Sequence, residues 1–64
     1  MGKKLHTVRP GDTLESIAAA YYKDDSLDDF IFQHNTTTIQ NPNALYPGQT
    51  IIIPHLPLLH WLTD

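Results

Sequence analysis

The first residues of the chain alternate between apolar and polar positions, and this two-residue period is typical of a strand. Residues 5–8 read LHTV and follow the alternation. Pro10 and Gly11 come directly afterwards, and both residue types interrupt regular structure. We therefore predict a short strand over residues 5–8.

After Gly11 the apolar residues recur at the 3.6-residue period of a helix. They are Leu14, Ile17, Ala18 and Tyr21. We expect this helix to begin at Thr13, with Asp12 as its N-cap and Glu15 as the partner of Asp12 in a capping box. Tyr22 lies off the apolar face, so its ring should be the freer of the two tyrosines. The apolar face requires a core to pack against.

The same spacing returns after the polar residues 23–26. Leu27, Phe30, Ile31 and His34 would form the apolar face of a second helix. Ser26 is the expected N-cap, and Asp29 places an acid near the positive end of the helix dipole. We expect His34 to be partly buried. Residues 35–38 (NTTT) favour local backbone hydrogen bonds and end the helix.

Two turn signals and a β-branched run complete the pattern. Residues 41–43 (NPN) and 47–49 (PGQ) predict turns, and residues 50–53 (TIII) predict a second strand that ends at Pro54. Two strands alone are marginally stable unless they pair and helices cover one face. The predicted fold is therefore α+β, a βααβ unit with two helices packed on one side of a two-stranded antiparallel sheet.

Composition limits the chain to one small domain. It has 64 residues, no cysteine and a formal net charge of −3. Without cysteine there is no disulfide, thiolate metal site or cysteine nucleophile. The acidic balance argues against a nucleic-acid partner, and no apolar run is long enough to span a membrane. The start of the chain does not resemble a signal peptide, so we expect a cytoplasmic protein or part of an exported or virion-like particle.

The polar residues indicate no catalytic or metal site and no cofactor. Asp24, Asp25, Asp28 and Asp29 lack the glycine and distal Glu of a calcium loop, and the four histidines are scattered. Asp12 and Glu15 are a carboxylate pair, but an exposed helix start lacks the apolar pocket that raises a pKa for acid catalysis. Asn35 begins a formal N-glycosylation sequence.

Two segments carry a resemblance to the lysin motif, or LysM, family. Residues 6–18 (HTVRPGDTLESIA) resemble the family's opening pattern, and residues 41–54 (NPNALYPGQTIIIP) resemble its closing pattern. The resemblance implies the same βααβ fold over residues 5–54, after an N-terminal extension at residues 1–4. It also implies a non-catalytic module that binds N-acetylglucosamine-containing glycan such as peptidoglycan or chitin, in several copies or on a larger assembly, with cell-wall contact.

The resemblance further implies a shallow glycan-binding groove between the two loops that flank the strands. The expected glycan-binding residues are Gly11, Asp12, Thr13, Leu14, Asn41, Pro42, Asn43, Ala44, Leu45 and Tyr46. Leu14 and Leu45 also fit the core by their spacing, Asp12 is also a helix cap, and Gly11 is also a turn residue.

A second resemblance gives an alternative function. Residues 21–35 (YYKDDSLDDFIFQHN) resemble LysM-type modules of phage-tail and contractile-injection proteins, which implies a structural adaptor of a baseplate or spike. The apolar C-terminal tail, residues 55–64, either folds back over the core or docks on a protein partner. The expected partner-binding residues are Leu56, Leu58, Leu59, Trp61 and Leu62.

Overall fold

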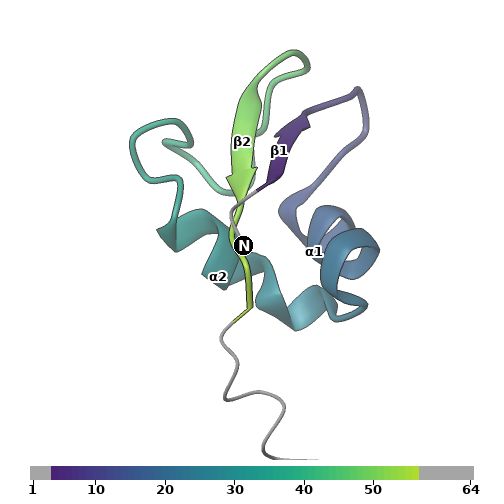
Figure 1. The fold of residues 1–64 in the computed structure, drawn as a ribbon. Coiled ribbons are helices and arrows are strands. Elements are labelled where there is room, and N and C mark those ends of the chain that lie inside the picture. The colour runs from purple at the N-terminus through teal and green to yellow at the C-terminus, as the bar shows by residue number, and fades with distance from the viewer. Residues whose placement is uncertain (1–3, 57–64) are drawn as a thin grey trace, which may run out of the picture.

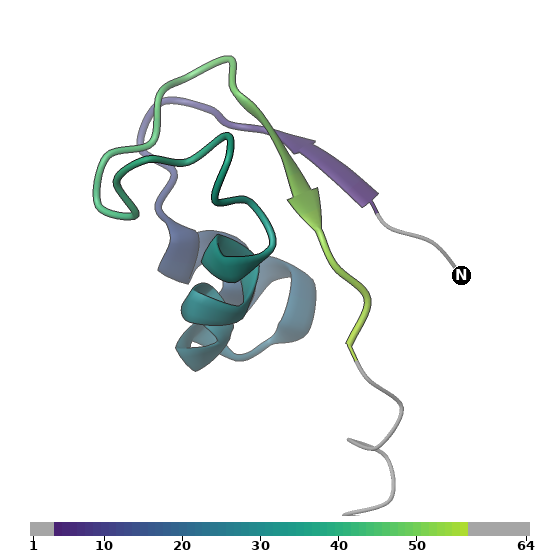
Figure 2. The ribbon, with the colours of Figure 1, turned by 90° about the vertical axis from the view of Figure 1, so that its left-hand side faces the viewer.

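The structure is a computed structural model and describes residues 4–56. Along the chain it contains β1 (Lys4–Thr7), α1 (Leu14–Tyr22), the 3₁₀ turn η1 (Asp25–Leu27), α2 (Asp28–Gln33) and β2 (Thr50–Ile53). The strands pair antiparallel with Leu5 opposite Ile52 and Thr7 opposite Thr50. Both helices lie on the same side of this sheet (Figures 1 and 2), so the predicted α+β fold is confirmed.

The core lies between the sheet and the helices. It is formed by the buried side chains of Val8, Leu14, Ile17, Ala18, Ile31, Ile39, Ile51 and Ile53. Three of the four residues predicted for the apolar face of α1 are in this set, but Tyr21 is 37% exposed. Tyr22 packs against the core instead, and its hydroxyl donates to the carbonyl of Pro54. The prediction that Tyr22 is the freer ring was therefore wrong.

Both helix starts lie one or two residues from their predicted caps. Thr13, not Asp12, is the N-cap of α1, and it forms a capping box with Ser16. Asp24, not Ser26, caps η1 by accepting from the Ser26 amide at 3.0 Å. The sequence offers several cap-forming residues in succession at each start, and the tertiary position of the loop decides which one takes the role.

The end of α2 also differs from the prediction. His34 is exposed, and its Nδ1 lies 2.9 Å from the carbonyl oxygen of Phe30. Asn35, one residue later, is the buried residue, with 3% of its surface exposed. A buried polar side chain is stable only when its hydrogen-bonding groups have partners.

The Asn35 carboxamide has a partner for each of its polar atoms. Its Oδ1 accepts from the Ile52 amide at 2.7 Å, and its Nδ2 donates to the carbonyls of Ile52 and Ile31, each at 2.8 Å. Because Leu5 pairs with Ile52 from the other side, the Asn35 side chain occupies the place of a third strand along β2. The buried carboxamide also makes Asn35 inaccessible to N-glycosylation in the folded chain.

We predict that Asn35→Ala lowers the free energy of unfolding by about 2–4 kcal/mol, because the amide and the carbonyl of Ile52 lose their partner and the Ile31 carbonyl keeps only the His34 amide. That is a large part of the ~3–10 kcal/mol expected for a domain of this size. Urea denaturation followed by circular dichroism would measure the change. Thr36→Ala is the control, because Thr36 is exposed and its loss should cost less than about 0.5 kcal/mol. Equal midpoints for the two variants would contradict the prediction.

Candidate functional site

Two loops lie side by side at the end of the sheet (Figure 2). The first loop (residues 8–13) leads from β1 into α1, and the second loop (residues 41–49) leads into β2. The Val8 amide donates to the Gln49 carbonyl at 2.8 Å, and the Gly48 amide donates to the Val8 carbonyl at 2.8 Å. Two residues therefore oppose Val8, which is the pattern of a β-bulge with glycine in its first position.

Each loop contains a tight turn that needs a glycine. In the first loop the Asp12 amide donates to the Arg9 carbonyl at 3.0 Å around Pro10 and Gly11. In the second the Gln49 amide donates to the Tyr46 carbonyl at 3.1 Å around Pro47 and Gly48. The two glycines have φ angles of 90° and 94°. Proline followed by a positive-φ glycine is the pattern of a type II turn, so any other residue there would be strained.

The Asp12 carboxylate closes the first loop. Its Oδ2 accepts from the Arg9 amide at 2.9 Å and lies 2.9 Å from Nε2 of His6. The hydrogen bond from the Arg9 amide, and then the one from His6, hold the pKa of Asp12 below its ordinary value of 3.8. Asp12 therefore stabilises the turn through its charged form.

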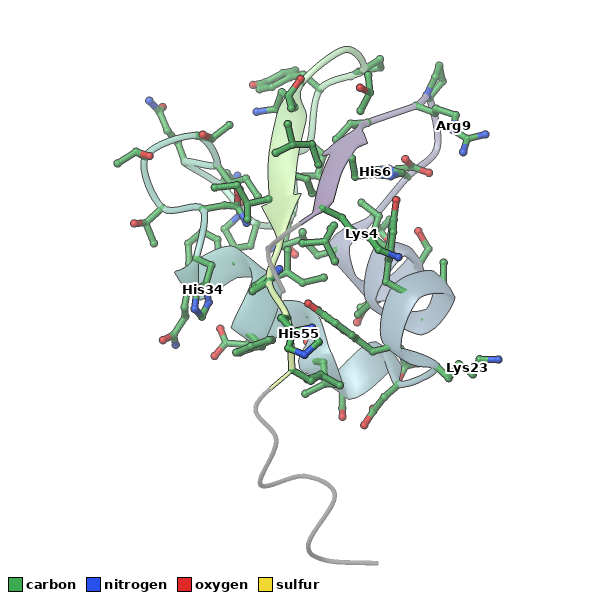
Figure 3. The ribbon with its side chains drawn as sticks, in the orientation of Figure 1. Lys4, His6, Arg9, Lys23, His34 and His55 are labelled. Atoms are coloured by element: carbon green, nitrogen blue, oxygen red, sulfur yellow. The ribbon has the colours of Figure 1, made fainter. Side chains whose placement is uncertain are left out.

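His6 connects the first loop to α1. Its Nδ1 lies 2.9 Å from the Tyr21 hydroxyl, and the His6 and Tyr21 rings meet edge to face with centroids 5.5 Å apart. Figure 3 shows His6 pointing from β1 toward the loop and the helix. Because an ionised carboxylate only accepts, Nε2 must carry a proton, so the neutral ring accepts the Tyr21 proton at Nδ1. The sequence pattern predicted no contact among His6, Asp12 and Tyr21.

Side chains also hold the second loop. The Asn43 amide donates to Oδ1 of Asn41 at 2.9 Å, which forms a small turn within the predicted NPN signal. Oε1 of Gln49 accepts from the Tyr46 amide at 2.7 Å, and its Nε2 donates to the Thr38 carbonyl at 3.2 Å. Gln49 therefore ties the second loop to the segment that follows α2.

The two loops and the start of α2 enclose a shallow hollow of about 140 Å³. It is lined by Asp12, Thr13, Leu14, Glu15, Asp28, Pro42, Asn43 and Leu45. Six of the ten residues expected in the groove are in this lining. Four are not: Gly11, Asn41, Ala44 and Tyr46, of which Tyr46 is 67% exposed.

Glu15 and Asp28 line the hollow although the sequence did not indicate them. Glu15 directly follows residues 11–14, which were the first group of residues expected in the groove. Its position in the first turn of α1 is a signal that could have identified it. Asp28 comes from the start of α2, which no sequence pattern places beside the loops. Its approach depends on how the helices pack.

The start of α1, whose residues line the hollow, has backbone donors without a partner. The Ser16 amide donates to Thr13 Oγ1 at 3.0 Å and the Ile17 amide to the Thr13 carbonyl at 2.9 Å. Within the described residues, the amides of Leu14 and Glu15 have no acceptor. Unpaired amides of a first helical turn are available to an oxygen atom of a ligand. With the carboxylates, the hollow therefore offers both donors and acceptors beside the apolar surface of Leu14 and Leu45.

No helix within residues 4–56 is long and apolar enough to cross a membrane. In the same part of the chain, no three His, Asp or Glu side chains lie close enough together to hold one metal ion.

The described chain ends at Leu56, on the far side of the molecule from the two loops (Figures 1 and 2). Leu56 is half-buried. The other expected partner-binding residues, Leu58, Leu59, Trp61 and Leu62, lie outside the described residues, and so does the choice between a tail that folds back and one that docks.

Comparison with known proteins places these loops within a family pattern. The LysM domain model matches residues 6–54. The chain is 37% identical over 51 residues to the potassium binding protein Kbp of Escherichia coli O6:H1, which covers 80% of this chain and 34% of the relative. It is 42% identical over 53 residues to an uncharacterized protein of Deinococcus radiodurans, which covers 83% of this chain and 20% of the relative. The chain thus spans about a third and a fifth of these two relatives.

The lowered pKa of Asp12 predicts how stability depends on pH. The unfolded chain binds a proton at Asp12 at higher pH than the folded chain, so the contribution of Asp12 is complete above its unfolded pKa of 3.8 and is lost as pH falls through the lower folded pKa. We expect Asp12→Asn to reduce the acid sensitivity of unfolding below about pH 5. Urea denaturation at a series of pH values would measure it.

Asp25→Asn is the matched control, because the Asp25 side chain is exposed and makes no hydrogen bond within residues 4–56. Its unfolding free energy should follow that of the unmodified chain at each pH. If Asp12→Asn ran parallel to both of them down to about pH 3, the ionised Asp12 would have no special part in folding.

Proposed function

The chain belongs to the LysM domain family, and we propose that it is a non-catalytic module that binds N-acetylglucosamine-containing glycan in the hollow between its two loops. One observation carries the proposal. The opening and closing motif segments, far apart in sequence, contribute seven of the eight residues that line one hollow. Because members of the family bind such glycans, we take this class of ligand for the chain, and we take the hollow as its binding site.

The chemistry of the lining suits an acetamido sugar. A carbonyl oxygen of the acetamido group would accept from the open amides of Leu14 or Glu15, and its N–H would donate to a carboxylate or to the Asn43 side chain. Leu14 and Leu45 offer apolar surface to the methyl group. Directional hydrogen bonds and apolar contacts of this kind match a sugar that carries an acetamido group.

The size of the hollow supports weak binding by a single copy. Ligand pockets commonly enclose about 300–1,000 Å³, whereas this hollow measures about 140 Å³. It would hold part of one sugar unit and leave the rest of the chain in solvent. Several copies, or attachment to a larger assembly, would raise the effective affinity without new contacts.

The carboxylates argue for binding instead of catalysis. A general acid for glycoside hydrolysis needs a raised pKa, and the pKa of Asp12 is lowered because its carboxylate accepts the Arg9 amide and His6 hydrogen bonds. Glu15 is exposed to solvent and lacks an apolar enclosure. Asp12 is thereby a structural acceptor at the rim of the proposed site.

The alternative is a structural adaptor of a phage-tail-like baseplate or spike. Its support is the apolar composition of residues 55–64 and the resemblance of residues 21–35. The described chain ends at the opposite end of β2 from the loops that line the hollow (Figure 1), so the two proposals concern different parts of the chain. The two proposals are therefore compatible in one molecule.

We predict that a short, fully acetylated chitin oligomer shifts the NMR amide signals of residues 11–14 and 41–46 in the labelled chain. Asn43→Ala should weaken binding by about two- to tenfold, the range for a lost neutral hydrogen bond, because this exposed side chain lines the hollow. Thr37→Ala, at an exposed position outside the hollow, should leave the affinity unchanged. Signal changes confined to other regions, or none, would contradict the glycan proposal.

The adaptor proposal predicts that the tail is needed for partner capture and not for folding. A chain ending at Leu56 keeps the Pro54 carbonyl that accepts from Tyr22, so its unfolding should remain cooperative. Compared with the full chain in the same tagged format, it should no longer co-purify with the assembly while it still binds the chitin oligomer. An assembly that retains the shortened chain would refute the adaptor proposal.

A further inference from the structure

The charges around the hollow have one sign. Three of its eight lining residues are carboxylates, Asp12, Glu15 and Asp28, and none is Lys, Arg or His. On the basis of the proposed glycan function, we infer that the hollow selects glycans by charge. It favours chains in which one acetamido group is replaced by a free, protonated amine, and it rejects chains that carry carboxylates.

The three carboxylates differ in the number of hydrogen bonds and ion pairs that they already form within the chain. Asp12 accepts from the Arg9 amide and pairs with His6. Asp28 accepts only from the amide of the next residue, Asp29, at 2.9 Å. Glu15 has no hydrogen-bond or ionic partner within residues 4–56. Glu15 and Asp28 are therefore the two carboxylates whose charge remains available to a ligand.

None of the Lys and Arg residues of the described chain lines the hollow. Lys23 is the C-cap of α1, whereas the hollow is at its N-terminus, so about 14 Å of helix separates them. Lys4 begins β1, at the end opposite the first loop. Arg9 is in the first loop, where its charge helps to lower the pKa of Asp12. Figure 3 shows Arg9 and Lys23 at two separate places on the outside of the molecule and Lys4 between them, near the start of β1.

The N-terminus of α1 acts in the opposite direction and is weaker. A helix dipole places about half a positive unit charge at its N-terminus, and this would attract an anion. The lining carries three formal negative charges, and Asp and Glu remain ionised at neutral pH. Even if His6 is protonated and the nearby Arg9 charge is counted in full, one negative charge opposes half a positive one. The hollow is therefore negative in sum.

Glycans built on glucosamine differ in charge at the same positions. An acetamido group is neutral, and a free amine protonates and donates three hydrogen bonds, as a lysine ammonium does. The lactyl and peptide carboxylates of peptidoglycan are anionic. A protonated amine in the hollow would meet Glu15 or Asp28, whereas a carboxylate would meet like charge with no Lys or Arg in the lining.

The test compares three ligands of equal sugar length by isothermal titration calorimetry with the full chain at about pH 6, where Asp and Glu are ionised. They are a fully acetylated chitin oligomer, the same oligomer with one free amine, and a peptidoglycan fragment that retains its carboxylates. At low salt we expect the amine ligand to bind about two- to fivefold more tightly than the neutral one, and the carboxylate ligand more weakly by a similar factor. These differences should shrink at high salt, where charges are screened.

Single substitutions test whether the carboxylates of the hollow cause the preference for the amine ligand. Glu15→Gln and Asp28→Asn each remove one charge with little change of shape and keep a hydrogen-bond acceptor. Each should reduce the ratio of the affinity for the amine ligand to the affinity for the neutral oligomer. Asp25→Asn makes the same change of charge at an exposed position outside the hollow and should preserve the preference.

The outcomes separate this inference from the proposed function. If the neutral oligomer binds but all three ligands have equal affinity, or if Asp25→Asn alters the preference as much as Glu15→Gln, charge selection by the hollow is refuted and glycan binding stands. If no ligand binds, the proposed function itself fails, and the inference that depends on it fails too.

Discussion

The structure depends on a single buried carboxamide, that of Asn35. A two-stranded sheet leaves one edge of β2 without a neighbour, and such an edge carries unpaired backbone groups. Asn35 supplies both the donor and the acceptor that Ile52 needs, and its second donor goes to Ile31 in α2. Its own carbonyl accepts from Thr38 and Ile39. One residue therefore completes the sheet, ends the helix and directs the buried Ile39 into the core.

The shape of the hollow depends on the position of β2, which Asn35 holds against α2. β2 fixes where the second loop ends, the bulge at Gly48 fixes its distance from Val8, and the Asp12 carboxylate fixes the first loop from the other side. His6 then connects this turn to Tyr21 on α1. Because each loop is held by side chain to backbone hydrogen bonds at both ends, the lining is largely preformed, which limits the ordering cost of binding.

Sequence alone predicts the elements of this chain and misses the contacts between them. The period of Leu14, Ile17 and Ala18 identifies the buried face of α1, and the two PG turns and the TIII run locate the end of the fold. The exchange of roles between Tyr21 and Tyr22, the pairing of His6 with Asp12 and the approach of Asp28 to the loops were not predicted. Each of these depends on tertiary packing between segments, which local periodicity does not encode.

A substitution at a surface position preserves the stability of the fold only where the original side chain makes no stabilising contact. Among the carboxylates of the hollow, Asp12 stabilises the fold, because its ionised side chain accepts the hydrogen bond of the Arg9 amide across the turn of the first loop. The Glu15 side chain makes no hydrogen bond or ion pair within the described residues, and the Asp28 side chain makes only a local hydrogen bond with the Asp29 amide. The charge of the hollow thus resides mainly on two side chains that carry little of the stability. The framework of the family and the ligand preference that we propose for this chain therefore depend on different residues of one small surface.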